Sequence, residues 1–242
     1  SAPKPKTTSP EGLVDMSDKH LSSQFDADLN TVSTRVLEMG GLVESQLHQA
    51  LYALVHLSLE TANQVIENEN RVNQMEREID HDITSTIARR QPTARDLRFL
   101  MAISRTTSNL ERAGDEVAKV ARMVKSIIEN GSPRSLPIAE LRLAADLAAA
   151  LMRKSLDAFA RLDTNMAIEI IKGDDAVDVE YDGFLRKLIT YMMEDPRKIT
   201  PSLDLLFLAK AIERIGDHAK NIAEFIIFIV KGADVRHTSV DY

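Results

Sequence analysis

Residues 100–128, LMAISRTTSNLERAGDEVAKVARMVKSII, are the stretch that decides the fold. Apolar and small residues recur in it at alternating spacings of three and four. This ladder consists of Leu100, Ile103, Thr107, Leu110, Gly114, Val117, Ala121, Val124 and Ile128. The spacing keeps one helix face apolar and is typical of a coiled-coil seam. It predicts a helix of about 30 residues, ~45 Å long, which ends at the Glu-Asn-Gly-Ser-Pro run over 129–133.

The same ladder occurs again 102 residues later in the chain. It consists there of Leu205, Ala209, Ile212, Gly216, Ala219, Ala223, Ile226 and Val230. Further upstream, apolar positions correspond at an offset of 105 residues, as in Ala53/Ala158 and Val72/Val177. The chain is therefore an internal duplication.

Prolines mark the bends between the expected helices, at Pro92, Pro133/Pro137 and Pro196/Pro201. The first half divides into helices over 22–58, 60–90 and 93–130, and the second into helices over 136–161, 163–194 and 199–231. Short corners make sequential helices neighbours in space. We therefore predict an all-α protein of two tandem, pseudo-symmetric antiparallel three-helix bundles, with residues 16–132 and 133–242 as its two domains.

Residues 1–15, SAPKPKTTSPEGLVD, show no hydrophobic periodicity. We interpret them as an expression tag or a disordered tail, with a native start at Met16.

Composition excludes several classes of function. The 242 residues include no cysteine, which excludes disulfides, thiol catalysis and thiolate metal sites. A net charge of -7 argues against nucleic-acid binding. No apolar run approaches the length of a membrane span, and the opening residues lack a secretion signal.

The third helix of each half carries the pentapeptide Glu-Arg-x-Gly-Asp. It reads Glu111 to Asp115 in the first half and Glu213 to Asp217 in the second. A spacing of four residues stacks the two carboxylates on one helix face, beside the seam. The central glycine costs about 1 kcal/mol relative to alanine inside a helix. It indicates either a close helix contact or room for something bound between helices.

The second helix of the second half supplies Asp174 and Asp178, again four residues apart. The offset of 105 places Glu69 and Asn73 at the equivalent first-half positions, and Glu76 follows one turn later. If the second and third helices are antiparallel, each half gathers four oxygen-bearing side chains.

Such carboxylates need protons, arginine or a cation, because two unit charges 4 Å apart repel by about 4 kcal/mol at an effective dielectric near 20. Oxygen ligands favour hard cations: Fe, Mn, Mg or Ca. The alternative is an ordinary exposed helix face on which Arg112 and Arg214 pair with the neighbouring aspartates.

The repeated pentapeptide, the Asp-x-x-x-Asp of 174–178, ARRQPTARDLR over 88–98 and TYMMED over 190–195 together resemble the PhoU family. The resemblance covers about residues 20–237.

This resemblance implies a cytoplasmic, non-enzymatic negative regulator of phosphate uptake and phosphate-starvation signalling. Its expected partners are the ATPase of the phosphate ABC transporter and a phosphate sensor histidine kinase. The membrane is reached only through these partners, and a homodimer is expected. Family members bind metal ions or iron clusters through Glu/Asp-x-x-x-Asp motifs. These match Glu111, Asp115, Asp174, Asp178, Glu213 and Asp217, whereas Asn73 predicts weaker or no metal binding in the first half.

Two other functions stay open from the residues themselves. A metal-free helical adaptor would use its charged faces for docking. A ferritin-like di-iron enzyme needs two Glu-x-x-His motifs, and only Glu78 to His81 fits. His81 and His218 are expected to be solvated or to face a partner.

An arginine-rich corner is a further candidate surface, for an acidic partner or an anion. It consists of Arg89, Arg90, Arg95 and Arg98. A solvated corner paired with nearby acids is the alternative. No glycine-rich phosphate loop or nucleophile elbow is present, so the sequence offers no catalytic site.

Overall fold

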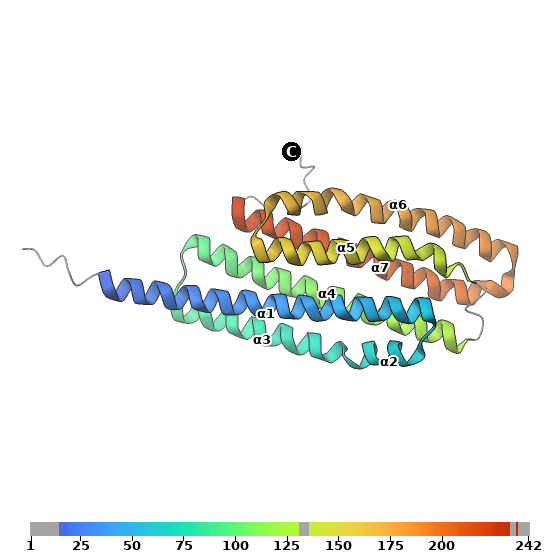
Figure 1. The fold of residues 1–242 in the computed structure, drawn as a ribbon, viewed down its shortest axis with the longest axis horizontal. Coiled ribbons are helices and arrows are strands. Elements are labelled where there is room, and N and C mark those ends of the chain that lie inside the picture. Colours follow the sequence, from blue (N-terminus) through green and yellow to red (C-terminus); the bar gives the residue numbers. More distant parts are fainter. Residues whose placement is uncertain (1–14, 131–135, 233–235, 237–242) are drawn as a thin grey trace, which may run out of the picture.

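The computed structural model describes residues 15–130, 136–232 and 236, and its regular secondary structure there is entirely helical. The helices are α1 (Asp15–His56), α2 (Leu59–Glu67), α3 (Glu69–Arg90), α4 (Ala94–Glu129), α5 (Ile138–Arg161), α6 (Thr164–Glu194), the 3-10 turn η2 (Pro196–Lys198) and α7 (Ile199–Lys231). The predicted all-α fold of two three-helix bundles is confirmed, with α2 and α3 together in the second helical position (Figure 1). The expected tail at 1–14 lies outside the described residues, and Asp15 already begins α1.

The helix expected over 60–90 is interrupted at a single residue, Asn68. Its N–H bonds back to the Gln64 carbonyl at 3.2 Å, which closes α2. Its own carbonyl accepts a bond of 3.4 Å from Gln46 Nε2 of α1. The equivalent residue 105 positions later is Gly173, inside the continuous helix α6. The break is therefore held by a side chain of a neighbouring helix, not by a helix-breaking residue.

The first corner of each half repeats in backbone detail. Leu57 and Leu162, 105 residues apart, both adopt left-handed φ values of 51° and 50°. The following residues, Ser58 and Asp163, both cap the next helix through their side-chain oxygens. These caps accept hydrogen bonds from backbone N–H groups that the first helical turn leaves unpaired. The duplication therefore extends from sequence to backbone conformation.

The two halves are joined through α4 and α7, which pack antiparallel along most of their length (Figure 1). Asn109 bonds to Asn221, Glu116 to Arg214 and Ser126 to Asp204, and the residue numbers in each pair add up to 330. Gly114 and Gly216 are the one pair of positions whose numbers add up to 330 and that also correspond to each other in the 102-residue repeat. A pseudo-two-fold axis therefore passes the α4–α7 contact at the level of these glycines.

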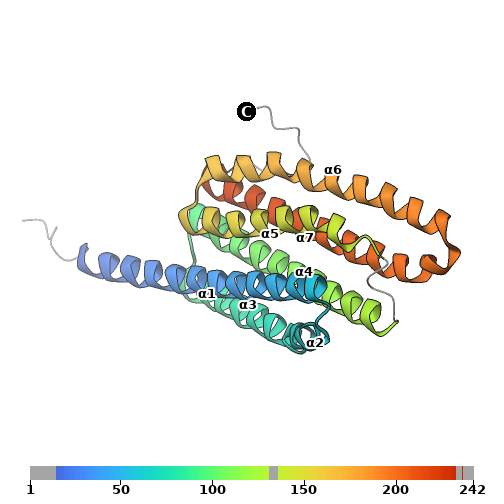
Figure 2. The same ribbon diagram turned by 45° about the vertical axis from the view of Figure 1, so that its right-hand side comes forward.

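The helices form four successive layers (Figures 1 and 2). α2 and α3 lie outermost on one side and α6 on the other, while α1 with α4 and α5 with α7 fill the middle. One continuous apolar core runs through both halves. Within the described ranges, no helix is both long and apolar enough to cross a membrane.

Candidate metal centre

Both pentapeptide glycines lie where a third helix packs closely against the second. A β-carbon added at Gly114 would come within 3.1 Å of Val72 on α3. One added at Gly216 would come within 3.3 Å of Asp174 Oδ1 and 3.5 Å of Val177 on α6. The glycines therefore allow close helix contact. At Gly216, in the second half, the nearest atom of the neighbouring helix is a carboxylate oxygen of Asp174.

Three second-half carboxylates converge at this contact. Asp174 and Asp178 project from α6 and Asp217 from α7, and one oxygen of each lies within 4.8 Å of the others. Asp174 is buried, with 2% of its surface exposed. An i, i+4 pair on one helix and a third carboxylate across the glycine contact form a compact set of oxygen ligands.

Two oxygens of this cluster have no protein donor. Asp174 Oδ1 and Asp178 Oδ1 are buried and accept no hydrogen bond from the described part of the chain. The other oxygen of Asp174, Oδ2, lies 3.5 Å from Lys220 Nζ. An unsatisfied buried acceptor costs about 1–3 kcal/mol. A bound cation would remove that cost, so the residues fit a hard metal ion.

The electrostatics of the cluster point the same way. Burial raises the pKa of Asp174, Asp178 and Asp217, and for Asp217 burial with the charge of Glu213 raises it to about 6. These carboxyls therefore hold protons more tightly than usual when no cation compensates their charge.

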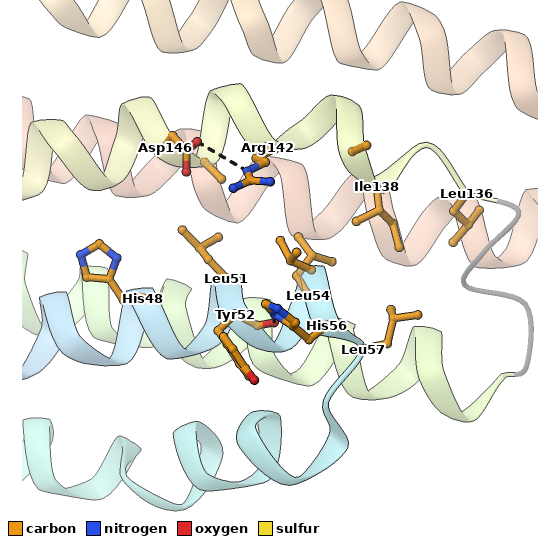
Figure 3. Close-up of a pocket in the computed structure, with 13 residues that line it drawn as sticks. His48, Leu51, Tyr52, Leu54, His56, Leu57, Leu136, Ile138, Arg142 and Asp146 are labelled. Atoms are coloured by element: carbon orange, nitrogen blue, oxygen red, sulfur yellow. Dashed lines mark hydrogen bonds and ion pairs between the residues drawn. The ribbon is translucent and has the colours of Figure 1, made fainter.

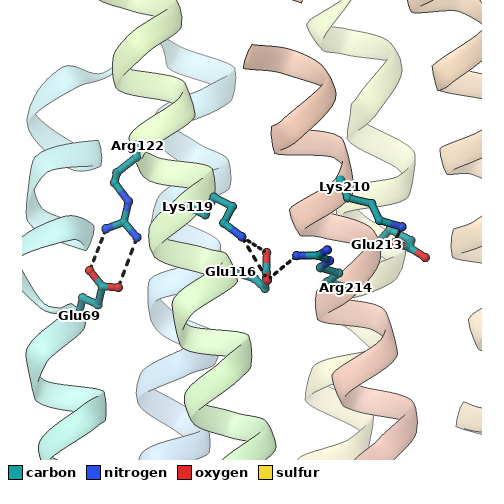
Figure 4. A network of polar contacts seen from close by, with 7 residues as sticks. All are labelled: Glu69, Glu116, Lys119, Arg122, Lys210, Glu213 and Arg214. Carbon is teal, nitrogen blue, oxygen red and sulfur yellow. Dashed lines mark hydrogen bonds and ion pairs between the residues drawn. The ribbon is translucent and has the colours of Figure 1, made fainter. Parts of the chain in front are cut away.

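Glu213, the fourth expected ligand, lies next to this trio but is not one of its three converging groups. Its carboxylate forms an ion pair of 2.6 Å with Lys210, one turn earlier on α7 (Figure 4). Lys210 also lies over the ring of Tyr181, 5.3 Å from its centre. Glu213 is therefore held by a lysine next to the cluster, and its other carboxylate oxygen takes no part in this ion pair.

The first-half site contains its own cation. Arg122 of α4 donates to both oxygens of Glu69, at 2.8 and 3.4 Å (Figure 4). The residue at the position of Arg122 in the second half is Glu224, and the first-half equivalent of Lys220 is Ala118. The two halves thus carry their internal cations at different places.

The remaining candidate ligands of the first half interact with one another. Glu111 and Asp115 share a hydrogen bond, and burial with the nearby Asp115 raises the pKa of Glu111 to about 7. Burial and the charges of Asp80 and Asp115 raise the pKa of Glu76. Asn73 Oδ1 is buried without a donor among the described residues, as is Asp178 Oδ1 at the equivalent position. No first-half trio converges as closely as Asp174, Asp178 and Asp217 in the part of the chain described.

The arginines expected to form one corner point to different neighbours. Arg90 pairs with Asp28 of α1 at 3.1 Å, and Arg89 donates to the carbonyl of Ser85. The guanidinium of Arg98 packs against Gly232, at the end of α7. Arg95 is exposed.

The two histidines differ from each other. His81 is exposed, as expected. His218 is half-buried, lines a groove between α4 and α7, and contacts α4: its Nδ1 lies 3.1 Å from Asn109 Oδ1, which also accepts a bond from Asn221. Burial lowers the pKa of His218 to about 4. Sequence reasoning missed this contact between the halves, and its one available signal was Asn109, a polar residue next to the seam residue Leu110.

The structure also contains a hollow of about 470 Å³ between the end of α1 and the start of α5 (Figure 3). Leucines form much of its lining, and Tyr52 and His56 stack at its edge with ring centres 4.0 Å apart. None of the candidate metal ligands lines it.

Comparison with known proteins places this geometry in a family. A family model described as "PhoU domain" matches the chain twice, over residues 36–124 and 141–226. A Burkholderia sp protein named "Phosphate-specific transport system accessory protein PhoU homolog" is 48% identical over 225 residues, which cover 93% of this chain and 96% of the relative. The Escherichia coli (strain K12) "Phosphate-specific transport system accessory protein PhoU" is 45% identical over 224 residues, 92% of each chain.

Solved structures agree with this assignment. The crystal structure of PhoU from Pseudomonas aeruginosa superposes with a TM-score of 0.83 at 44% identity, covering 86% of this chain and all of that one. The phosphate transport system regulatory protein PhoU from Streptococcus pneumoniae gives a TM-score of 0.81 at 28% identity, covering 90% and 100%.

Proposed function

This chain belongs to the PhoU family, and from that membership we propose that it is a cytoplasmic, non-enzymatic accessory regulator of the phosphate-specific transport system. It represses phosphate uptake and phosphate-starvation signalling through contacts with two proteins. These are the ATPase of the phosphate ABC transporter and its sensor histidine kinase.

The observation that carries this proposal is end-to-end similarity. The relatives named as accessory proteins of the phosphate-specific transport system align over nine-tenths or more of both chains. Similarity confined to one domain would support only part of a relative's function for this chain. Here both repeats align in one continuous chain.

A reporter strain tests the regulatory role. In a strain that lacks this gene, a phosphate-starvation promoter should be active in phosphate-rich medium, and the wild-type gene should silence it again. Unchanged reporter output after deletion would rule the role out.

The same proposal includes one metal centre, in the second half. Asp174, Asp178 and Asp217 would hold a hard cation, Fe, Mn, Mg or Ca, with Glu213 as a fourth ligand. When bound, the cation would neutralise the cluster and tie α6 to α7. Its support is the pair of buried, donor-free oxygens on Asp174 and Asp178.

Elemental analysis tests the metal centre. Protein purified without chelator should contain metal, and a Glu213→Ala/Asp217→Ala variant should contain far less. Equal metal content in both proteins would rule out the proposed metal site.

A metal-free helical adaptor is the second candidate, because the chain supplies cations of its own. Lys210 pairs with Glu213 and Lys220 lies near Asp174. If these lysines suffice, metal removal should leave both the melting temperature and partner binding unchanged. The expected homodimer is tested separately by light scattering.

A further inference from the structure

Two lysines lie against the carboxylates of the candidate metal centre, and neither occupies a position of the carboxylate motifs. Lys220 of α7 lies 3.5 Å from Asp174 Oδ2. Lys210, on the same helix, pairs with Glu213 at 2.6 Å (Figure 4). Each lysine therefore places an ammonium group next to one of the expected ligands.

The lysines accompany the metal centre and are not a requirement of the fold. The first-half residue equivalent to Lys220, 102 positions earlier, is Ala118, and the equivalent of Lys210 is Ser108. The same helix thus forms in the first half without a lysine at either position. Both lysines occur in the half in which three carboxylates converge.

Together, the expected ligands and these lysines carry a net charge of -2. Metal-binding carboxyls are ionised, and four of them contribute -4: Asp174, Asp178, Glu213 and Asp217. The two lysines contribute +2. The converging trio with Lys220 alone gives the same -2, because Glu213 and Lys210 cancel. One divalent cation would therefore bring the centre to neutrality, whereas a trivalent cation would leave an excess positive charge.

Other charged groups nearby change this balance little. Asp175 and Asp182 act on Asp178 from exposed positions of α6, where water screens them. Asp217 also lines the groove between α4 and α7, where two arginines face two further acids: Arg112, Arg214, Asp115 and Glu116. Those four charges cancel. The two lysines are therefore the cations that set the charge of the centre.

Lys220 and a bound cation do not compete for the same oxygen. Lys220 lies at Oδ2 of Asp174, whereas Oδ1 of this buried residue and Oδ1 of Asp178 accept no hydrogen bond from the described residues. A cation at the donor-free oxygens would therefore have the ammonium group as a neighbour. The repulsion between the two grows in proportion to the charge of the cation. Burial of Asp174 strengthens this effect, because little water screens it.

We propose that Lys220, supported by Lys210, is a specificity-determining residue of the metal centre, which makes the site favour one divalent cation over a trivalent one. The inference rests on the metal centre of the proposed function and narrows its ions to Mg, Ca, Mn and ferrous iron. The number of ligand charges tunes the affinity of other oxygen-ligand sites in the same way. A lysine lowers that number by one without removing a ligand.

Calcium and terbium test this proposal, because both prefer oxygen ligands and are similar in size but differ by one unit of charge. Ca²⁺, Mn²⁺ and Tb³⁺ are titrated calorimetrically into protein stripped with a chelator. Lys220→Met removes the charge and keeps a long side chain. Its affinity for Tb³⁺ relative to Ca²⁺ should rise about tenfold over the wild type. Lys210→Met should shift this ratio in the same direction, because it leaves Glu213 without its cation.

Two control variants separate charge at the site from other effects. Lys220→Arg keeps the positive charge and should keep the wild-type ratio. Lys154→Met should keep it too, because Lys154 pairs with Glu169 away from the converging trio, and its side chain is 39% exposed, against 34% for Lys220. Circular dichroism checks that each variant is folded, and Lys210→Met carries the comparison if Lys220→Met is not.

The outcomes distinguish this inference from the metal centre itself. A Tb³⁺-to-Ca²⁺ affinity ratio that is unchanged in folded Lys220→Met would overturn the role of the lysine and leave the metal centre intact. An equal shift in Lys220→Arg or Lys154→Met would do the same. Wild-type protein that binds none of the three ions would overturn the metal centre as well.

Discussion

Gly216 of α7 lies so close to Asp174 of α6 that a single added methyl group would come within 3.3 Å of the carboxylate oxygen Oδ1. The glycine that permits helix contact therefore also sets the space available to a candidate ligand.

Replacing this glycine should separate stability from metal binding. In Gly216→Ala the helix gains about 1 kcal/mol of propensity and loses a similar amount to the tight contacts with Asp174 and Val177. We expect a nearly unchanged melting temperature and at least tenfold weaker metal binding in a calorimetric titration. Gly183→Ala, where an added β-carbon meets nothing within 4 Å, is the control. It should gain stability and bind metal normally, and normal binding by Gly216→Ala would contradict the site.

The first half should be convertible into a metal site. The double variant Asn73→Asp/Arg122→Ala restores the carboxylate of the second half and removes the guanidinium that pairs with Glu69. We expect it to bind one more equivalent of metal than the wild type, measured by elemental analysis after dialysis against the ion.

The two single variants of this pair serve as controls. Arg122→Ala frees Glu69 but leaves an amide at position 73, and Asn73→Asp leaves the arginine in place. Each should gain less metal than the double variant. An unchanged metal content in all three would show that something other than these two residues closes the first-half site.

Stability of the metal-free protein should fall as pH rises. The pKa of Asp217 is raised to about 6 and that of Glu111 to about 7. A carboxyl with a raised folded-state pKa contributes stability below its unfolded pKa, near 4, and loses that contribution as pH rises through the folded value. The melting temperature in a chelator should therefore drop between about pH 4 and about pH 7.

His218 requires a control in this experiment, because its lowered pKa of about 4 gives the opposite trend. Asp217→Asn removes one titrating carboxyl and keeps His218, so its melting temperature should depend less on pH than that of the wild type. An added divalent cation should restore wild-type stability at the higher pH and have less effect on Asp217→Asn. A melting temperature that rises with pH in both proteins would contradict the raised pKa values.

Two adjacent glycines test the packing of α1 on α5. A β-carbon at Gly40 would come within 2.3 Å of the buried Leu156, whereas one at Gly41 would meet nothing within 4 Å. Gly40→Ala should cost about 1–3 kcal/mol, the usual penalty of overpacking. Gly41→Ala should gain about 1 kcal/mol from helix propensity alone. Urea unfolding measures both, and equal effects would show that Leu156 moves aside freely.

The helices and the duplication could be predicted from sequence because both are visible in local spacing. The ladder from Leu100 to Ile128 identifies α4, and its recurrence identifies α7. The break at Asn68 could not be predicted, since it depends on Gln46 from another helix. The relevant information lies in how α1 packs on α2, not in the residues of the break.

The carboxylates of the candidate site could be predicted for the same reason, but the cations beside them could not. Asp174 and Asp178 are one helical turn apart, and the repeat aligns Asp217 with Asp115. Arg122 reaches Glu69 across 53 residues of sequence and Lys220 reaches Asp174 across 46. Those contacts are decided by the rotation and register of packed helices, which periodicity leaves open.

The α4–α7 contact places two versions of one ancestral unit in a single polypeptide. In an assembly of identical subunits every substitution appears twice, so a site and its symmetry mate must change together. Here a substitution such as aspartate against asparagine at positions 178 and 73 changes one copy alone. Fusion has freed the two sites to specialise, while the α4–α7 register still relates their positions by the pseudo-two-fold axis.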